Sequence, residues 1–600
     1  MKYSEQQQAV INEPGNMVVN AIAGSGKTTT LAGYAKARNA KPILYLAFNN
    51  SVKQEALQKF QSLDIKNVRV ETAHSLALGH FRNRNFKIYK GSYQPYDIKQ
   101  ILGYQLKDAI ADMKFGRHVL QMTAAFCNSV EARVSQLAYP DLIKDVEEKA
   151  FVNSAYDLLE KETRRFLGMM KSGEIEMMHD FYLKLYQLST PDLSFYEHIL
   201  FDEGQDASQV MLDVFLNQPG QKVIVGDEHQ QIYSWRYATN ALKLSDFPRK
   251  YLDTSYRFGQ DIGDLAKAIL NTKSHLEEIR VPDIKGKGSS ENSKVAATLG
   301  RTNGAILVDV IEQLVEKENI KSVYFEGHFN SYTYADEGGS VYDVLNLYLD
   351  KHKLIRNPMV KQFKDFSELE IYTEQSGDAP MKGIMEIVKT YGKELPRMIN
   401  CIKDNHVEHT EKQEVDMIYS TVHKAKGMEY DQVHLLEDFL GEEKLLDLLN
   451  RSDIHADPDR LLEDINILYV ALTRAKSKVV LPQSLIPEDY EPEGKEALEV
   501  LMPKLETISG EGFEDFRNAV SKVSSEVKKA VGKAFSHEEV RKTKPSAYKP
   551  WTSEEDDELE LLFVNQASVK EMADHFGRSR GAIHSRIKKL ELRDKYFDVG

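Results

Sequence analysis

The stretch that decides the fold is Ala21-Ile22-Ala23-Gly24-Ser25-Gly26-Lys27-Thr28. The apolar residues 17–20 before it predict a short buried strand, and residues 29–37 after it predict a helix. Glycines between a strand and a helix allow backbone N–H groups to surround phosphate oxygens, and the start of the helix adds a partial positive charge. Lys27 then reaches the β- and γ-phosphates, and the Thr28 hydroxyl holds Mg²⁺. The stretch therefore predicts a loop that binds nucleotide phosphates, although Ala21 occupies the position of the usual first glycine.

The acidic run Asp202-Glu203-Gly204-Gln205-Asp206 supplies the second half of a hydrolytic site. It follows the strand-like residues 198–201, and ligands of open α/β sheets bind at the C-terminal ends of the strands. Asp202 is expected to hold Mg²⁺ from the side opposite Thr28, and Glu203 to orient and activate the attacking water. A solvated loop is the alternative for an isolated acidic run, but the phosphate loop makes the catalytic interpretation the better one.

The composition predicts a soluble protein of several domains, with 600 residues of which 42% are hydrophobic and 28% charged. The net charge of −14 argues against a globally basic surface for nucleic acid, but it leaves room for a local basic groove. No apolar run is long enough to span a bilayer, residues 1–6 lack the pattern of a signal peptide, and Cys127 and Cys401 lie far apart. We expect a cytoplasmic protein with no membrane partner, and favour a bacterial or phage source over a eukaryotic nucleus.

Alternating strand-like and helix-like segments predict an α/β fold. It consists of two parallel-sheet P-loop domains, each interrupted by a helical insertion, and a small C-terminal three-helix domain. The sheet pattern fades after Val480. The expected segments are the first α/β domain over 1–90 and 189–275, its insertion over 91–188, the second α/β domain over 276–337 and 413–504, its short insertion over 338–412, a helix with a basic linker over 505–548, and the three-helix domain over 549–600.

Six further motifs follow the phosphate loop in a fixed order. They are Ala47-Phe48-Asn49, Thr72-Ala73-His74-Ser75, residues 226–236, Ser255-Tyr256-Arg257, residues 421–430 and residues 468–475. Together with the phosphate loop and the acidic run, they resemble the UvrD/Rep-type superfamily 1 DNA helicases, and within these the F-box DNA helicase branch, over roughly residues 1–485. No F-box is evident in the sequence. The resemblance implies two RecA-like domains, with ATP and Mg²⁺ as cofactors.

The resemblance also implies roles for individual residues. The implied catalytic residues are Lys27, Glu203, Gln230, Arg257 and Arg474. The implied nucleotide-binding residues are Gln6, Ala23, Gly24, Ser25, Gly26, Lys27, Thr28, Thr29, Tyr256, Gly427 and Glu429. The implied Mg²⁺ ligands are Thr28 and Asp202. The implied DNA-binding residues of the helicase region are Phe48, Asn49, Thr72, His74, Tyr233, Trp235, Thr421 and His423.

These residue types suit the chemistry without the resemblance. A γ-phosphoryl group in transfer spreads negative charge over its equatorial oxygens, and Lys27, Arg257 and Arg474 are three cations that can meet it. If Arg474 comes from a different domain, hydrolysis requires closure of the cleft. For Trp235 it is the resemblance that makes stacking on DNA bases the expected role, because an aromatic residue at such a position is more often part of a core. The alternatives are a surface ion pair for each arginine, a core position for Trp235 and a backbone bridge for His423.

A compact C-terminal module begins at Trp551-Thr552-Ser553-Glu554-Glu555-Asp556 and resembles a Myb/SANT-like helix-turn-helix. Thr552 and Glu555 form a capping box, and a third helix over 580–590 is basic. Arg580, Arg586 and Lys589 are therefore the expected contacts to duplex DNA. A protein-binding three-helix domain is the alternative.

The expected function is an ATP-dependent DNA helicase or translocase that works on single-stranded DNA and single/double-strand junctions in DNA repair or recombination. A 3′→5′ polarity is implied by the resemblance alone, and a recombinase or repair protein is an expected partner. Two alternatives stay open. One is a translocase that strips recombinase filaments and unwinds little, and the other is a DNA-stimulated ATPase switch that recruits partners.

Overall fold

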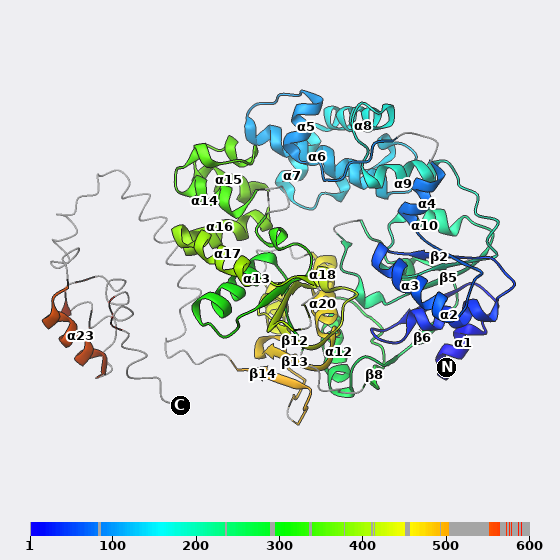
Figure 1. Ribbon diagram of the computed structural model, residues 1–600. Helices are drawn as coiled ribbons and strands as arrows, with labels where there is room; N and C mark the ends of the chain where they lie inside the picture. Colours follow the sequence, from blue (N-terminus) through cyan, green and yellow to red (C-terminus); the bar gives the residue numbers. More distant parts are fainter. Residues whose placement is uncertain are drawn as a thin grey trace. The chain divides into compact units, whose positions relative to one another are not determined.

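The structure is a computed structural model that describes residues 2–81, 86–234, 237–288, 295–334, 339–376, 378–409, 414–450, 457–492, 494–502 and 551–564, together with residues 412, 572, 575, 576, 578, 586 and 590. The chain forms two compact units, Met1–Pro503 and Lys504–Gly600. The first unit holds two six-stranded sheets, in which the described neighbouring strands are parallel (Figure 1). No helix among the described residues is long and apolar enough to cross a membrane.

The first sheet has the strand order β3-β2-β4-β5-β1-β6. Its strands are β1 (Met17–Ala21), β2 (Ile43–Ala47), β3 (Val68–Thr72), β4 (His198–Phe201), β5 (Gln221–Gly226) and β6 (Arg249–Leu252). Its flanking helices are α1 (Glu5–Ile11), α2 (Lys27–Ala37), α3 (Asn50–Ser62), α10 (Gln209–Leu216) and α11 (Ala241–Leu244). Every residue of β1, β2 and β4 is buried, as expected for a parallel sheet covered on both faces. Only β5 separates β1 from β4, so the phosphate loop and the acidic run leave the same edge of the sheet close together.

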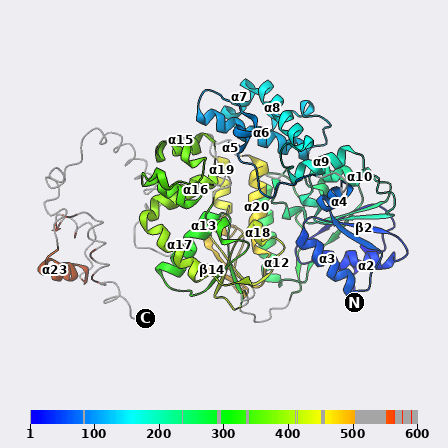
Figure 2. The same ribbon diagram turned by 45° about the horizontal axis from the view of Figure 1, so that its top comes forward.

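A helical insertion separates β3 from β4 and forms the blue-to-cyan group in Figure 2. Its helices are α4 (Ala73–His80), α5 (Pro95–Leu102), α6 (Ala109–Asn128), α7 (Val146–Ser154), α8 (Tyr156–Ser172) and α9 (His179–Leu188). Buried residues of α6 and α8, such as Phe115, Met122 and Phe166, belong to one apolar core that continues to Ile199 of the first sheet.

The second sheet has the strand order β10-β11-β9-β12-β13-β14. Its strands are β9 (Ala296–Gly300), β10 (Val323–Phe325), β11 (Met417–Thr421), β12 (Tyr430–Leu435), β13 (Ala475–Pro482) and β14 (Leu498–Leu501). Strand β14 pairs with β13 beyond the point where the sequence pattern fades. Its four residues alternate between half-buried and exposed, so this short edge strand lacks the continuous apolar run of a central strand.

The second insertion lies between β10 and β11. It contains α14 (Val341–Tyr348), α15 (Phe366–Ser376), α16 (Ala379–Tyr391) and α17 (Leu395–Asp404), which share a core with α13 (Asn303–Val310). Met113 of the first insertion is buried in this same core, and Arg117 donates a hydrogen bond to the Tyr372 hydroxyl of α15. The two insertions are therefore in direct contact.

Helix α12 (Gln260–Asn271) lies before residue 275, within the segment that the sequence assigns to the first α/β domain. It packs against α20 (Pro458–Leu472), and its buried Ile262, Leu265 and Ile269 belong to the core of the second sheet. The helical spacing of apolar residues in α12 would be the same whichever domain it packs against. Only the tertiary packing therefore places this helix with the second sheet. The other strands and α-helices of the first unit, among the described residues, are β7 (Thr254–Ser255), β8 (Lys285–Gly286), α18 (Val422–Ala425) and α19 (Glu442–Asn450).

The described part of the second unit contains α23 (Ser553–Val564), which begins at the expected capping box. The Trp551 ring lies under the Arg578 guanidinium at 4.2 Å and also contacts Phe576. The linker 505–548 lies outside the described residues.

Candidate active site

The phosphate loop connects β1 to α2. Gly24 and Gly26 have φ angles of 72° and 79°, a region that L-residues with side chains rarely adopt. A Cβ on Gly24 would also lie 2.6 Å from both Arg257 Cβ and Ser255 Oγ. The loop therefore requires glycine at residue 24 for its backbone conformation and for its close contact with the segment after β7.

Three contacts hold this loop in place. The Tyr256 N–H donates to the Gly24 carbonyl at 2.9 Å, and Lys27 Nζ donates to the Ala21 carbonyl at 3.2 Å. The buried Gln7 side chain donates to the Ser25 carbonyl at 3.4 Å, while its Oε1 accepts the Ser4 N–H. Gln7 was not predicted as a site residue. The sequence feature that could have identified it is the capping box of Ser4 and Gln7, which fixes the start of α1 beneath the loop.

The carboxylates after β4 have unequal surroundings. Asp202 is buried, accepts a hydrogen bond from the Tyr45 hydroxyl and accepts the Glu203 N–H at 3.0 Å. Burial and the adjacent Glu203 carboxylate raise the pKa of Asp202. Burial opposes the charge on Glu203 as well, but Lys27 and Lys426 hold its pKa below the ordinary value. Glu203 is thus kept ionised by cations, whereas at Asp202 burial and the Glu203 charge outweigh the attraction of Lys27.

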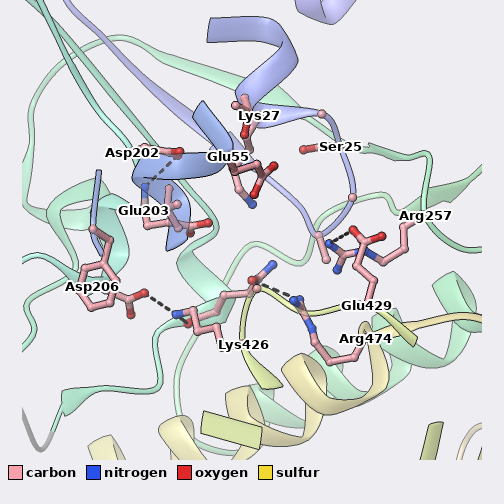
Figure 3. A pocket seen from close by; sticks show the side chains of 18 of the residues that line it. Ser25, Lys27, Glu55, Asp202, Glu203, Asp206, Arg257, Lys426, Glu429 and Arg474 are labelled. Atoms are coloured by element: carbon pink, nitrogen blue, oxygen red, sulfur yellow. Dashed lines mark hydrogen bonds and ion pairs between the residues drawn. The ribbon is translucent and has the colours of Figure 1, made fainter. Parts of the chain in front are cut away.

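Arg474 and Lys426 approach from the second-sheet elements, and Arg257 from the segment beside the phosphate loop (Figure 3). Arg257 forms an ion pair with Glu429 at 2.6 Å and donates to the Thr473 carbonyl at 2.9 Å. Arg474 follows α20, is only 2% exposed, and donates to the Val470 carbonyl at 3.0 Å. Burial and the charge of Arg257 lower the pKa of Arg474 to about 9, so Arg474 stays protonated at neutral pH.

Gln230 connects these cations to the first sheet. Its Nε2 donates to Asp227 Oδ2 at 2.7 Å, and its Oε1 accepts from Arg474 Nη2 at 3.5 Å. Lys426 donates to the Gln230 carbonyl at 2.6 Å and pairs with Asp206. Neither Lys426 nor Asp206 was predicted to act here, although both lie inside motifs that the sequence displays.

A cavity of about 310 Å³ lies among these groups. Its lining includes these predicted nucleotide, metal and catalytic residues: Ala23, Gly24, Ser25, Gly26, Lys27, Thr28, Thr29, Asp202, Glu203, Gln230, Tyr256, Arg257, Gly427, Glu429 and Arg474. The buried Ser25 Oγ has no hydrogen-bond partner. The Thr28 hydroxyl and the Asp202 carboxylate are oxygen donors of the kind that Mg²⁺ prefers. The cavity therefore fits a nucleoside triphosphate with Mg²⁺.

Gln6 is the predicted nucleotide contact that lies outside this lining. Its Nε2 donates to Asp253 Oδ2 at 3.3 Å, and its Oε1 accepts the Asp253 N–H at 3.1 Å. In this structure Gln6 therefore joins α1 to the chain after β6, because its amide finds a complementary partner there.

The predicted DNA-binding residues fall into separate places. Phe48 and Asn49 line the cavity together with Tyr233, and the rings of Phe48 and Tyr233 stack with centroids 5.7 Å apart. The Asn49 side chain caps α3 by accepting the Val52 N–H at 2.9 Å. These three residues therefore lie at the nucleotide cavity rather than in a groove separate from it.

The other predicted DNA contacts of the first unit lie at element ends. Thr72 caps α4 by accepting the Ser75 N–H, and His74 lies 3.5 Å from Asp180 of α9. Thr421 is buried at the end of β11. His423 Nε2 donates to the Ile232 carbonyl at 3.1 Å, which is the backbone bridge that the sequence left open. Trp235 lies outside the described residues.

In the second unit, the Arg586 side chain is engaged in contacts within its own module. It forms an ion pair with Asp556 at 2.5 Å and lies 5.7 Å from the Trp551 ring. The expected DNA contact is thus engaged within its own module, because the acidic first helix offers a nearby carboxylate. Arg580 and Lys589 lie outside the described residues.

Two parallel sheets that both contribute side chains to one cavity beside a phosphate loop define the class, a P-loop protein whose nucleotide site lies between two domains. Residues 3–248 match the UvrD/REP helicase N-terminal domain, and residues 153–484 match the UvrD-like helicase C-terminal domain. The chain therefore belongs to the UvrD-like helicase family.

Curated relatives extend this comparison. F-box DNA helicase 1 of Gallus gallus is 29% identical over 81% of this chain and 49% of its own length, and F-box DNA helicase protein 1 of Schizosaccharomyces pombe is 27% identical over 80% and 57%. The ATP-dependent DNA helicase UvrD1 of Mycobacterium tuberculosis is 27% identical over 47% of this chain and 41% of its own length. This chain thus spans about half the length of the F-box relatives. Since these two broad matches are eukaryotic, they give no support to the expected bacterial or phage source.

Proposed function

We propose that this protein is an ATP-driven DNA helicase or translocase that moves on single-stranded DNA. The observation that supports it best is the pairing of Gln230, in the first-sheet domain, with Arg474, which follows α20 in the second. A cavity lined from both domains couples the state of the nucleotide to the relative position of the two sheets, and such coupling is what a motor requires.

In this proposal each residue has a distinct task. Lys27 binds the phosphates, Thr28 and Asp202 hold Mg²⁺, and Glu203 accepts a proton from the attacking water. Bound Mg²⁺ neutralises charge on the phosphate oxygens. Arg257 and Arg474 stabilise the charge that develops on the γ-phosphoryl group. Gln230 senses the γ-phosphate and transmits its presence to the other residues of the segment 227–231.

The aromatic pair Phe48 and Tyr233 links this site to the proposed DNA track. The Tyr233 hydroxyl donates to the His423 carbonyl at 3.0 Å, so the pair touches the second domain as well as the cavity. Trp235 follows Tyr233 by two residues in the sequence, and stacking on bases is its proposed role.

The finer assignments follow the family resemblance. They are a 3′→5′ direction, single/double-strand junctions as substrates, a role in DNA repair or recombination, and a recombinase or repair-protein partner. The C-terminal module is proposed to add contacts to duplex DNA.

The decisive experiment measures ATP hydrolysis with and without single-stranded DNA, followed by unwinding of 3′-tailed and 5′-tailed duplexes. We expect hydrolysis to be stimulated by the single strand and unwinding to require the 3′ tail. Removal of recombinase from DNA with little unwinding would favour the filament-stripping alternative. Stimulated hydrolysis without movement on DNA would favour the switch, and hydrolysis indifferent to DNA would contradict the proposal.

A further inference from the structure

Lys273 is a buried lysine at the junction of the two domains. It lies in the turn Thr272–His275 after α12 and is 5% exposed. Its Nζ donates to Asn466 Oδ1 of α20 at 2.6 Å and lies 3.1 Å from His229 Nδ1. Because an ammonium group only donates, His229 Nδ1 must be the acceptor, and burial together with the nearby Lys273 charge lowers the pKa of His229 so that it stays neutral.

The contacts of Lys273 continue into the site. Asn466 Nδ2 donates to the Gln231 carbonyl at 2.8 Å, so its amide is fixed by Lys273 on one side and by Gln231 on the other. One turn along α20, the Tyr469 hydroxyl donates to Asp227 Oδ2 at 3.1 Å, the same oxygen that accepts from Gln230. Positions 466, 469 and 473 share one face of the helix, and Arg474 follows directly.

The segment 227–231 is also tied to the phosphate loop. Asn20, at the end of β1, donates to Glu228 Oε1 at 2.6 Å and accepts the Glu228 N–H at 3.3 Å. The same five residues therefore connect the strand before the phosphate loop to the helix that carries Arg474. Lys273 contacts both His229 of this segment and Asn466 of α20, so it bridges the segment and the helix.

We propose that Lys273 is a positioning residue that sets the register of α20 against the segment 227–231, so that Arg474 meets Gln230 as hydrolysis requires. This inference rests on the proposed function. Without the ammonium group, Asn466 Oδ1 and His229 Nδ1 lose their shared donor, and α20 is free to shift relative to Gln230. Lys273 is not among the residues that line the cavity, so we expect its replacement to leave nucleotide binding nearly unchanged.

The test compares Lys273→Met with Lys222→Met in the full chain. Lys222 is also buried, but it donates to the Gln218 and Gly220 carbonyls at the start of β5, far along the sheet from Gln230. We expect Lys273→Met to lower kcat in the presence of single-stranded DNA by about 10- to 100-fold, as for a misplaced catalytic group, with KM for ATP nearly unchanged. Lys222→Met should lower the unfolding temperature and leave kcat unchanged. Equal kcat in the two variants would overturn the inference.

A second variant decides the matter if Lys273→Met folds poorly. Asn466→Asp keeps an acceptor for Lys273 but cannot donate to the Gln231 carbonyl, so it should reproduce the loss of kcat. Normal DNA-stimulated turnover in Asn466→Asp would contradict the proposed route. A wild-type protein whose hydrolysis ignores DNA would instead contradict the proposed function, which separates the two failures.

Discussion

Asp202 and Glu203 are adjacent in the chain but occupy opposite electrostatic situations. Glu203 has a φ angle of 52°, which turns its side chain away from the course of β4 and toward the lysines. Asp202 stays beneath the loop with the Tyr45 hydroxyl. Two neighbouring carboxylates thus have environments that separate their pKa values, and this is the usual basis for distinct roles in catalysis.

Glu203→Gln should bind ATP and hydrolyse it roughly 10²- to 10⁴-fold more slowly, because the amide keeps the size of the side chain but cannot accept the proton. The measurement is single-turnover hydrolysis beside equilibrium binding of a fluorescent ATP analogue.

Asp202→Asn is the comparison variant. It should raise the Mg²⁺ concentration needed for half-maximal activity, an effect that Glu203→Gln should lack. An identical, modest defect in both variants would contradict the division of roles.

Among the elements, α6 and α7 of the first insertion are joined by a charged cluster. Glu148 of α7 lies 2.7 Å from His118 Nε2 and 2.9 Å from Lys114 Nζ, both on α6. Burial works against the charged carboxylate, but the hydrogen bonds from His118 and Lys114 lower the pKa of Glu148 to about 2. The short helix α7 has one buried apolar residue, Val152, so this cluster is important for holding it.

Glu148→Gln should lower the unfolding temperature at pH 7 by roughly 1 °C for each kcal/mol lost, because the entropy of unfolding grows with the size of the unit Met1–Pro503. Because the folded pKa lies below the ordinary 4.5, the stabilisation is fully present above about pH 4.5 and is lost as the pH falls toward 2. The difference between wild type and variant should therefore narrow on acidification, as followed by thermal unfolding at several pH values.

The control for this variant is Glu160→Gln, which removes the exposed pair of Glu160 with Arg164. It should change the unfolding temperature little at any pH. A pH-independent difference between wild type and Glu148→Gln would argue that the cost comes from packing rather than charge.

For the whole molecule, the division into Met1–Pro503 and Lys504–Gly600 separates the cavity from the C-terminal module. The cavity and the Lys273 connection lie within the first unit. In the module, Arg578 pairs with Glu555 and Arg586 pairs with Asp556. These ion pairs stabilise the described part of the module from within.

Deletion of residues 504–600 should preserve DNA-stimulated ATP hydrolysis while weakening binding to forked duplex and reducing its salt dependence, since phosphate contacts release counterions. A salt titration of binding for full-length and truncated protein checks this. Equal affinity and equal slope would favour a protein-binding role for the module. Arg586→Ala is a useful companion, because loss of its ion pair should also destabilise the module.

The sequence by itself determined the features that depend on neighbours along the chain. The phosphate loop between Met17–Ala21 and Lys27–Ala37, the acidic run after β4 and the two parallel sheets all follow from local apolar runs, glycines and caps. The phosphate loop and the acidic run meet in one cavity for the same reason, since strand ends of a parallel sheet lie at one edge.

Only the tertiary structure decided the contacts between distant segments. It paired Gln6 with Asp253, brought Phe48 and Tyr233 to the cavity, packed α12 on the second sheet and joined Arg586 to Asp556. Lys273 and Asn466 are 193 residues apart, and neither has a local pattern that indicates the other. The physical reason is that a buried polar group is placed by whichever partner the packed domains bring within reach, which local periodicity does not encode.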